Sequence, residues 1–80
     1  MRIDKFLKVS RIIKRRTIAQ EACDGGRVSI NGKTVKPGAD VKIGDIVEVR
    51  FGNNTTKFRV DSLAEHVTKD NAKEMFTIVE

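Results

Sequence analysis

The stretch that decides the fold runs from Arg15 to Val35 and reads RRTIAQEACDGGRVSINGKTV. Residues 15–24 predict a helix, because apolar residues recur there at the spacing of one helical face. That apolar stripe comprises Ile18, Ala19, Ala22 and Cys23. The glycines at 25–26 end the helix, and Asn31-Gly32 predicts a tight hairpin turn between strands at 28–30 and 34–35. The chain therefore changes from helix to β-hairpin within this stretch.

The flanking sequence extends this pattern in both directions. Residues 3–8 predict a short helix, and 9–14 a connection with Ile12 and Ile13 turned inward. Further strands are expected at 46–51, 57–60 and 75–79, whereas 62–74 remains unassigned. Helices followed by strands predict an α+β fold, with two short N-terminal helices packed on a small, mainly antiparallel five-stranded sheet. At 80 residues, we expect 1–80 to form a single domain.

Charge is distributed unevenly along the chain. The net charge is +5, and residues 1–36 hold ten Lys or Arg against three Asp or Glu. Such an excess predicts a polyanionic partner, either nucleic acid or a membrane surface. No apolar run is long enough to span a membrane, and the N-terminus lacks the apolar core of a secretory signal. We expect a cytoplasmic protein, since its lone cysteine forms no internal disulfide.

The sequence contains few candidates for catalytic or metal-binding side chains. Cys23 lies on the predicted buried stripe and is interpreted as a core residue, and His66 has no partner at nucleophile or metal spacing. No acid–base or nucleophilic constellation is recognisable. We therefore predict no enzyme activity, no catalytic residues, no metal site and no cofactor.

The basic residues of the first half form a pattern of their own. Lys14, Arg15 and Arg16 stand at the start of the second predicted helix, where the helix dipole disfavours cations unless an anion docks there. A solvated charged face would explain the run equally well by itself. The other polar positions of the two helices and their connection extend this run into one basic surface, and such a surface favours nucleic acid as the partner. These positions are Arg2, Lys5, Lys8, Arg11 and Gln20.

Aromatic residues are few, with no Trp or Tyr. Phe51 and Phe58 stand at alternating strand positions and are expected in the core. Recognition by base stacking is thus disfavoured. The protein is instead expected to recognise phosphates, 2′-hydroxyl groups and the shape of the nucleic acid, which favours structured RNA as the target.

Four segments within residues 2–45 resemble the RNA-binding domain named after ribosomal small-subunit protein four, the αL motif. They are Arg2–Leu7 (RIDKFL), Lys14–Ala19 (KRRTIA), Gly26–Lys33 (GRVSINGK) and Val41–Asp45 (VKIGD). We expect the core motif to cover about residues 2–50. The whole chain is similar to two bacterial families built on this domain: ribosome-associated quality-control factors and small heat-shock proteins that bind free large subunits.

The resemblance implies RNA-facing residues at the matching positions, listed as Arg2, Asp4, Lys5, Lys8, Arg11, Lys14, Arg15, Arg16, Thr17 and Gln20, with Arg27 and Lys33 added beside the hairpin. Asp4 could hold Arg15 or Arg16 in place, or simply cap the first helix. Arg16 is expected to be the most sensitive position, exposed and dispensable for folding. The acidic second half is expected to support the fold and not to contact RNA, so that charge reversal at Glu65, Asp70 or Glu74 changes RNA affinity by little.

The resemblance also implies a function and partners. The chain would bind large-subunit ribosomal RNA and tRNA on obstructed subunits that carry peptidyl-tRNA. It would support C-terminal alanine tailing beside a protein that delivers alanyl-tRNA, and be monomeric off the ribosome. The alternatives are a heat-shock-type ribosome recycling factor, a duplex-DNA binder, or a basic adaptor for another anionic surface such as lipid or an acidic protein.

Overall fold

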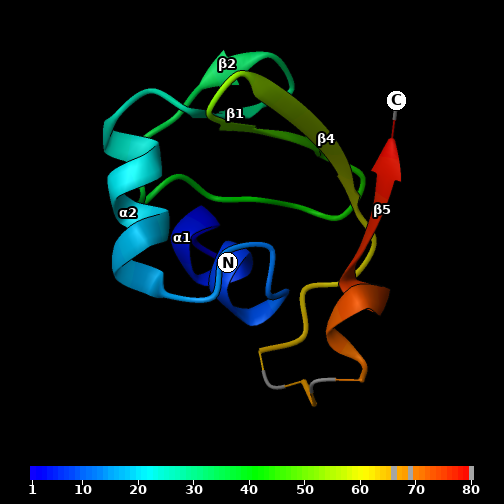
Figure 1. The fold of residues 1–80 in the computed structure, drawn as a ribbon. Coiled ribbons are helices and arrows are strands. Elements are labelled where there is room, and N and C mark those ends of the chain that lie inside the picture. Colours follow the sequence, from blue (N-terminus) through cyan, green and yellow to red (C-terminus); the bar gives the residue numbers. More distant parts are fainter. Residues whose placement is uncertain (66, 69, 80) are drawn as a thin grey trace.

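Two helices and a five-stranded antiparallel sheet make up the fold of the computed structural model, which describes residues 1–65, 67–68 and 70–79 (Figure 1). The helices are α1 (Ile3–Val9) and α2 (Arg16–Asp24). The strands are β1 (Val28–Ile30), β2 (Lys33–Thr34), β3 (Ile46–Phe51), β4 (Asn54–Val60) and β5 (Phe76–Val79), in the spatial order β2-β1-β3-β4-β5. A 3₁₀ helix, η1 (Ala72–Met75), precedes β5. The predicted α+β architecture is confirmed.

The element ends differ from the prediction by small amounts. Helix α2 begins at Arg16, so that Arg15 is its N-cap residue, and β4 begins three residues earlier than expected. The unassigned stretch contains η1. No helix among the described residues is both long and apolar enough to cross a membrane.

The hairpin turn is as predicted. Asn31 and Gly32 have φ angles of 51° and 83°, which are the positive values of a type I′ turn, and Ile30 pairs with Lys33 across it. The Asn31 side chain also accepts a hydrogen bond from the backbone N–H of Ile46 (2.9 Å) and donates one to Asp45 (3.1 Å). These bonds fasten the β1–β2 turn to the start of β3.

The core lies between the helices and the sheet. Its fully buried members include Ile3, Phe6 and Leu7 of α1, Ala19 and Cys23 of α2, and Val28, Val47, Val49 and Val60 of the sheet. Phe58 is buried too and packs edge-on against Phe76, with ring centroids 5.2 Å apart. Ile13 is buried and Ile12 half-buried, as expected.

Two residues expected in the core are instead exposed. Ile18 and Phe51 each retain 46% of their accessible surface. Ile18 lies outside the arc that α2 buries, because Ala19, Ala22 and Cys23 already fill that arc. Phe51 forms the last pair of the β3–β4 hairpin before its turn, beyond the strand's fully buried positions Val47 and Val49.

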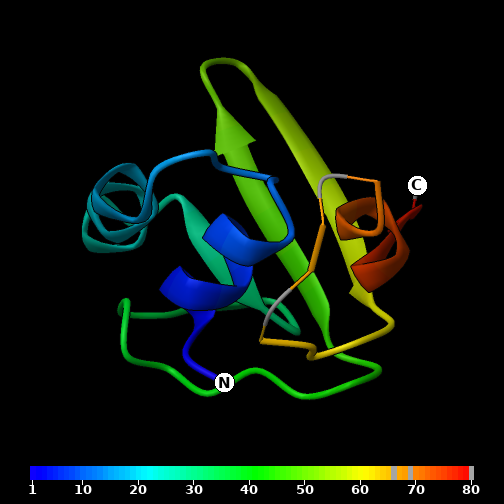
Figure 2. The ribbon, with the colours of Figure 1, turned by 90° about the horizontal axis from the view of Figure 1, so that it is seen from below.

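Helix α1 occupies the middle of the helical layer, with α2 on one side and the segment leading to η1 on the other (Figures 1 and 2). This segment contributes the partly buried Leu63 and Val67 to the core. It also brings Glu65 to α1, where Lys5 Nζ lies 3.4 Å from the Glu65 carboxylate. An acidic residue of the second half thus reaches the basic helix.

Candidate nucleic-acid interface

A buried carboxylate organises the polar side of the two helices. Asp4 has no accessible surface, yet it sits below two arginine side chains that are about half exposed. Arg2 donates from Nε to Oδ1 and from Nη2 to Oδ2, both at 3.2 Å. Arg16 donates from Nε to Oδ2 at 3.3 Å and from Nη2 to Oδ1 at 3.5 Å. Gln20 donates its amide to Oδ2 at 3.0 Å.

We call Arg2, Asp4, Arg16 and Gln20 the Asp4 cluster. Asp4 also accepts the backbone N–H of Lys5 at 2.8 Å, which satisfies one of the free amides in the first turn of α1. Burial raises the pKa of the Asp4 carboxyl, but the hydrogen bonds from Gln20, Arg16 and Lys5 outweigh burial and hold that pKa below its ordinary value of 3.8. The group is therefore a carboxylate at neutral pH, and its negative charge fixes both guanidinium groups.

The geometry combines the two expected roles of Asp4, because its carboxylate both accepts a first-turn backbone N–H of α1 and bonds Arg16. Asp4 orients Arg16, as one reading expected, but it bonds Arg2 and Gln20 in place of Arg15. Helix α1 has Arg2 as its N-cap residue, without a side-chain capping bond. Gln20 is half-buried and donates its amide to Asp4, so this side chain helps to hold the carboxylate in position.

Arg16 differs from its expected free state. Its Nε and Nη2 groups are engaged with Asp4, so its alanine variant would remove two donors from a buried carboxylate. Arg16 is exposed, as predicted, but its side chain is not free, and its dispensability for folding stays a prediction. A guanidinium has five N–H donors, and those not bonded to Asp4 remain for an anion.

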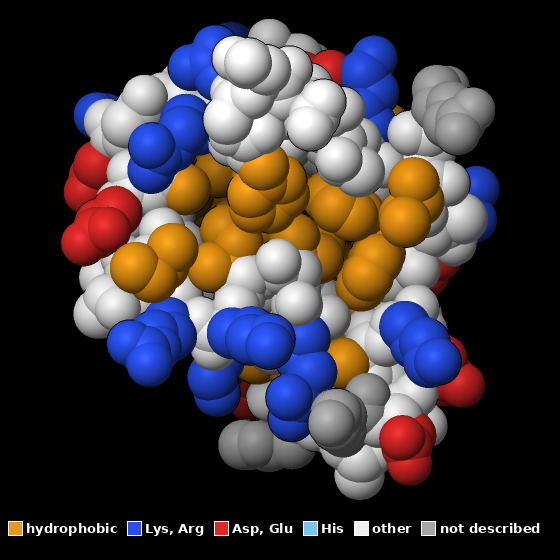
Figure 3. Space-filling model, viewed as in Figure 1, with side chains coloured by type: hydrophobic (Ala, Val, Ile, Leu, Met, Phe, Trp, Pro, Cys, Tyr) orange, Lys and Arg blue, Asp and Glu red, His pale blue; other side chains and the backbone are white. Residues whose placement is uncertain are grey.

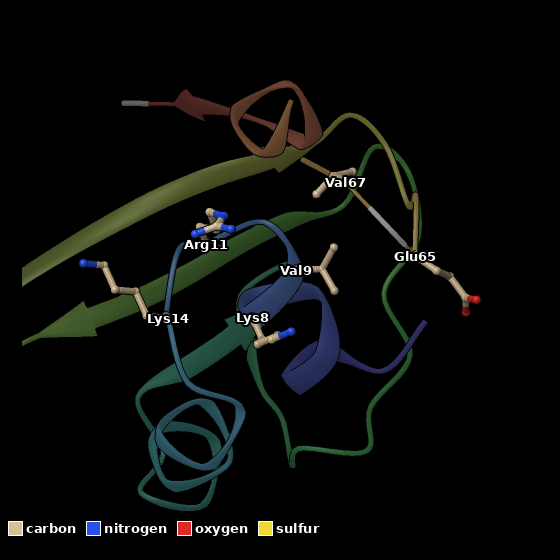
Figure 4. Close-up of a pocket in the computed structure, with 6 residues that line it drawn as sticks. All are labelled: Lys8, Val9, Arg11, Lys14, Glu65 and Val67. Atoms are coloured by element: carbon tan, nitrogen blue, oxygen red, sulfur yellow. The ribbon is translucent and has the colours of Figure 1, made fainter. Parts of the chain in front are cut away.

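Three more basic side chains line a cleft formed by the end of α1, the α1–α2 connection and the segment before η1. Lys8, Arg11 and Lys14 line it together with Val9, Glu65 and Val67, and its volume is about 280 Å³ (Figure 4). We call it the cationic cleft. The cations come from the end of α1 and the α1–α2 connection, whereas Glu65 and Val67 come from the segment before η1. The three cations give the cleft a positive charge that suits a phosphate group, and Glu65 stands at its wall with its carboxylate pointing away from Arg11 and Lys14 (Figure 4).

Arg11 adopts an uncommon backbone conformation. Its φ angle is 63°, which costs about 1 kcal/mol for a residue with a Cβ atom. The conformation ends α1, because the Arg11 N–H bonds the Lys8 carbonyl and the Ile13 N–H bonds the Leu7 carbonyl. Glycine would fit this turn better. The arginine at this strained position is thus better explained by its charge in the cationic cleft than by the turn.

The remaining predicted site residues are placed around these two features. Lys5 is half-buried between them and paired with Glu65, and Arg15 and Thr17 are exposed at the start of α2. Arg27 and Lys33 are exposed beside the hairpin and belong to neither the Asp4 cluster nor the cationic cleft. The structure therefore gathers most of the predicted residues of the helices and their connection, and leaves Arg15, Thr17, Arg27 and Lys33 outside the Asp4 cluster and the cationic cleft.

Other reactive groups have structural roles. Cys23 is buried as expected, and burial, together with the charges of Asp4 and Asp24, raises its thiol pKa to about 11. That value suits a core residue and not a nucleophile. Within residues 1–65, 67–68 and 70–79, no three His, Cys, Asp or Glu side chains gather as metal ligands would. His66, to which we assign no role, lies outside the described residues.

Sequence reasoning missed Glu65 as a neighbour of the basic surface. Its position depends on how the segment after β4 returns to α1, and no local pattern encodes that return. The positioning role of Gln20 could have been predicted from the sequence, because Arg16 and Gln20 stand one helical turn apart and share a face of the helix.

Comparison with known proteins gives consistent matches over the whole chain. The family model of the S4 domain matches residues 1–47. The chain is 52% identical over 79 residues to the RQC P-site tRNA stabilizing factor of Bacillus subtilis, covering 99% of this chain and 92% of that protein. It is 49% identical over 79 residues to the factor of the same name from Listeria monocytogenes, covering 99% of this chain and 86% of that protein. The solved structure of trimeric Heat Shock Protein 15 from Vibrio cholerae superposes with a TM-score of 0.90 at 26% identity, covering 99% of this chain and 81% of that one.

Proposed function

The chain belongs to the S4 domain family, and from this premise we propose that residues 1–80 form one RNA-binding domain that recognises structured RNA through the Asp4 cluster and the cationic cleft. The observation that carries the proposal is a fully buried carboxylate that fixes two half-exposed guanidinium groups. Such prepositioned donors lose little side-chain entropy when they bind a phosphate. Lys5, Lys8, Arg11, Lys14, Arg15 and Thr17 extend the contact surface, with Arg27 and Lys33 as peripheral contacts.

We further propose that the RNA is ribosomal. Relatives covering almost all of this chain carry the name RQC P-site tRNA stabilizing factor, which points to large subunits that still hold a tRNA in the P site. On this proposal the chain contacts ribosomal RNA and tRNA on obstructed large subunits in the cytoplasm. It supports C-terminal alanine tailing as a monomeric, non-enzymatic factor beside a protein that delivers alanyl-tRNA.

A second candidate is a heat-shock-type factor that acts on large ribosomal subunits. The structural likeness to Heat Shock Protein 15 supports it, at a TM-score of 0.90 over nearly the whole chain. Both candidates use the same RNA-binding surface. They differ in what the chain supports on the subunit, which is C-terminal alanine tailing for the first candidate and ribosome recycling for the second.

Gradient sedimentation of a lysate tests the proposal. We expect the protein to migrate with large subunits and to be released by ribonuclease, and we expect peptidyl-tRNA on the subunits that it captures. Capture of subunits whose nascent chains carry no C-terminal alanine tail, although the alanyl-tRNA-delivering protein is present, would favour the second candidate. Migration at the top of the gradient in low salt would contradict both.

A salt titration tests the electrostatic basis. If about four to six phosphates are neutralised, the logarithm of the association constant should fall with the logarithm of salt concentration at a slope between about −3 and −5. A slope near zero would contradict binding through the basic surface. Competition by duplex DNA of equal length should be weaker than by structured RNA, because DNA lacks the 2′-hydroxyl groups.

A further inference from the structure

An apolar groove opens on the other side of α2. It is lined by Ile12, Ile18, Val49 and Phe51, with Arg27 and Arg50 also in its wall, and has a volume of about 330 Å³. Ile18 and Phe51 are two of the four large hydrophobic residues that stay exposed among the described residues. Figure 3 shows hydrophobic side chains gathered at the centre of one face, with Lys and Arg side chains around much of their border.

The groove is distinct from the Asp4 cluster and the cationic cleft, and it shares with the proposed RNA surface the peripheral residue Arg27. Arg16 and Gln20 project toward Asp4, while Ile18 lies two residues from each of them and so about 200° away around the helix. None of the residues lining the groove belongs to the Asp4 cluster or to the cationic cleft. Ligands could therefore occupy both surfaces at once.

Exposure of these side chains is unfavourable in the isolated protein. Ile18 is a medium-sized aliphatic residue and Phe51 a large aromatic one, and neither finds cover although both stand next to a well-packed core. Large apolar groups that gather at a hollow and are bordered by polar ones are characteristic of interaction sites. The wall supplies two arginines and not one acidic residue.

We propose that this groove docks an acidic segment of a partner protein, which inserts one or two large apolar side chains against Ile18 and Phe51 and pairs its carboxylates with Arg27 and Arg50. The charge of the wall selects this occupant. A second copy of the chain, itself of net charge +5, would meet like charge. The proposal goes beyond RNA binding and does not depend on it.

RNA bases fit the groove less well than an apolar side chain does. Its wall is mainly aliphatic, with one aromatic ring, and it offers few partners for the hydrogen-bonding edges of a base. A base buried there would lose hydrogen bonds to water without replacement. A Leu or Phe side chain carries no such cost, and Arg27 and Arg50 then serve the flanking carboxylates.

A labelled hexapeptide provides the test, with Leu and Phe at its centre and two acidic residues on each side. Titrated into the intact protein, it should shift the NMR signals of the Ile18 methyl groups and the Phe51 ring. Replacing the central Leu and Phe of the peptide by Ser, or its acidic residues by Lys, should weaken binding about tenfold or more in each case. The absence of binding at millimolar peptide would overturn the proposal.

Protein variants locate the site. Ile18→Ser and Phe51→Thr should each weaken peptide binding about tenfold, whereas Ile43→Ser is the matched control, because Ile43 is 65% exposed and does not line the groove. Thermal melts check that all three variants fold. Equal affinity of the Ile18→Ser variant and the unaltered protein would overturn the proposal.

Two further titrations cover the other occupants. A single-stranded RNA hexamer that shifts the Ile18 and Phe51 signals more strongly than the peptide would assign the groove to RNA and overturn the proposal. Concentration-dependent shifts at these residues in the absence of peptide would assign it to a second copy, with the same consequence. Unchanged signals in both titrations would support a protein segment as the occupant.

Discussion

The two sides of α2 make a useful contrast. On one side, Arg16 and Gln20 are already bonded to a buried carboxylate, and Arg2 joins them from the other helix. On the opposite side, Ile18 lines an open groove together with Phe51, and each keeps 46% of its surface exposed. The same nine-residue helix thus carries a completed polar network and an uncovered apolar surface.

This difference indicates how each side binds. The polar side has its donors positioned before any ligand arrives, so its affinity depends on the internal bonds of the Asp4 cluster as well as on contacts with the ligand. The apolar side depends on the area that a partner covers. Substitutions on the polar side should therefore alter both stability and RNA binding, whereas those on the apolar side should alter neither.

The largest effect is expected from Asp4→Asn. Asn keeps one acceptor oxygen, but it loses the charge and places an NH2 donor where the second oxygen accepted bonds from other donors. We expect a loss of about 2–3 kcal/mol in the free energy of unfolding, the low end for a broken buried ion pair because both arginines are half exposed. The melting temperature should fall by about 10–20 °C. RNA affinity should fall in the same variant under conditions where it is folded. A variant as stable as the unaltered protein would show that Asp4 does not hold the cluster together.

The pH dependence of stability sharpens this prediction. Because the pKa of Asp4 is lowered on folding, its stabilising contribution is complete above the ordinary value of 3.8 and is lost as the pH falls below it. Asp40 and Asp61 also have lowered pKa values, held down by the N-terminal ammonium and by Thr77 respectively, and they lose their contributions in the same window. The difference in melting temperature between the unaltered protein and Asp4→Asn should therefore shrink below pH 4 while both still unfold cooperatively. A constant difference would contradict the ionised state of Asp4.

Arg16→Ala should have the next largest effect. Loss of a charge-assisted pair should cost about 1.5–3 kcal/mol of RNA affinity, or about 10- to 150-fold, and the Asp4 bonds that it removes should cost about 1 kcal/mol of stability. Arg16→Lys should recover only part of the affinity, because lysine lacks the planar fork. The measurements are RNA titration and thermal melting.

Arg59→Ala is the matched control for Arg16→Ala. Arg59 is half exposed and paired with Asp61 at 2.9 Å, but it stands on β4 away from both helices. Its loss should leave RNA affinity almost unchanged. Equal losses from the two variants would mean that only total charge matters, and the arrangement of the Asp4 cluster would then be irrelevant to binding.

Glu65→Lys should have a smaller effect of the opposite sign. Glu65 pairs with Lys5 and lines the cationic cleft, so it competes with a phosphate for the cations, and its reversal should tighten RNA binding about two- to fivefold. This expectation replaces the one from sequence, in which charge reversal at Glu65 changes RNA affinity by little. Glu74→Lys on η1 adds the same charge outside the cleft and should change the affinity much less. Equal tightening by both variants would point to net charge alone.

The smallest effect on RNA binding is expected from Ile18→Ser and Phe51→Thr. Both side chains lie on the apolar side of the contrast, so RNA affinity should stay within about twofold and the free energy of unfolding within about 0.5 kcal/mol, as for surface substitutions. RNA titration and thermal melting measure both quantities. A loss comparable to that of Arg16→Ala would show that the two sides of α2 act as one surface.

The comparison of expected and observed elements follows a physical pattern. The hairpin at Asn31-Gly32 and the end of α2 depend on residues adjacent in the chain, and local conformational preference is enough to predict them. The alternation in β3 was correct for Val47 and Val49 but wrong for Phe51, because alternation states which face a residue lies on and not how far the covering layer extends. The prediction that Ile18 is buried was wrong for the same reason, because helical periodicity does not state how wide an arc of the helix the neighbouring layer covers.

The sequence by itself determined that basic residues concentrate on two short helices joined to an antiparallel sheet, and that Asp4 stands among them. The tertiary structure alone decided which of these charges meet. It buries Asp4 under Arg2 and Arg16, brings Glu65 back to Lys5, and places Ile18 and Phe51 in the wall of one groove. These contacts join residues far apart in the chain, and they form only when burial of the common core brings the helices, the sheet and the returning segment together.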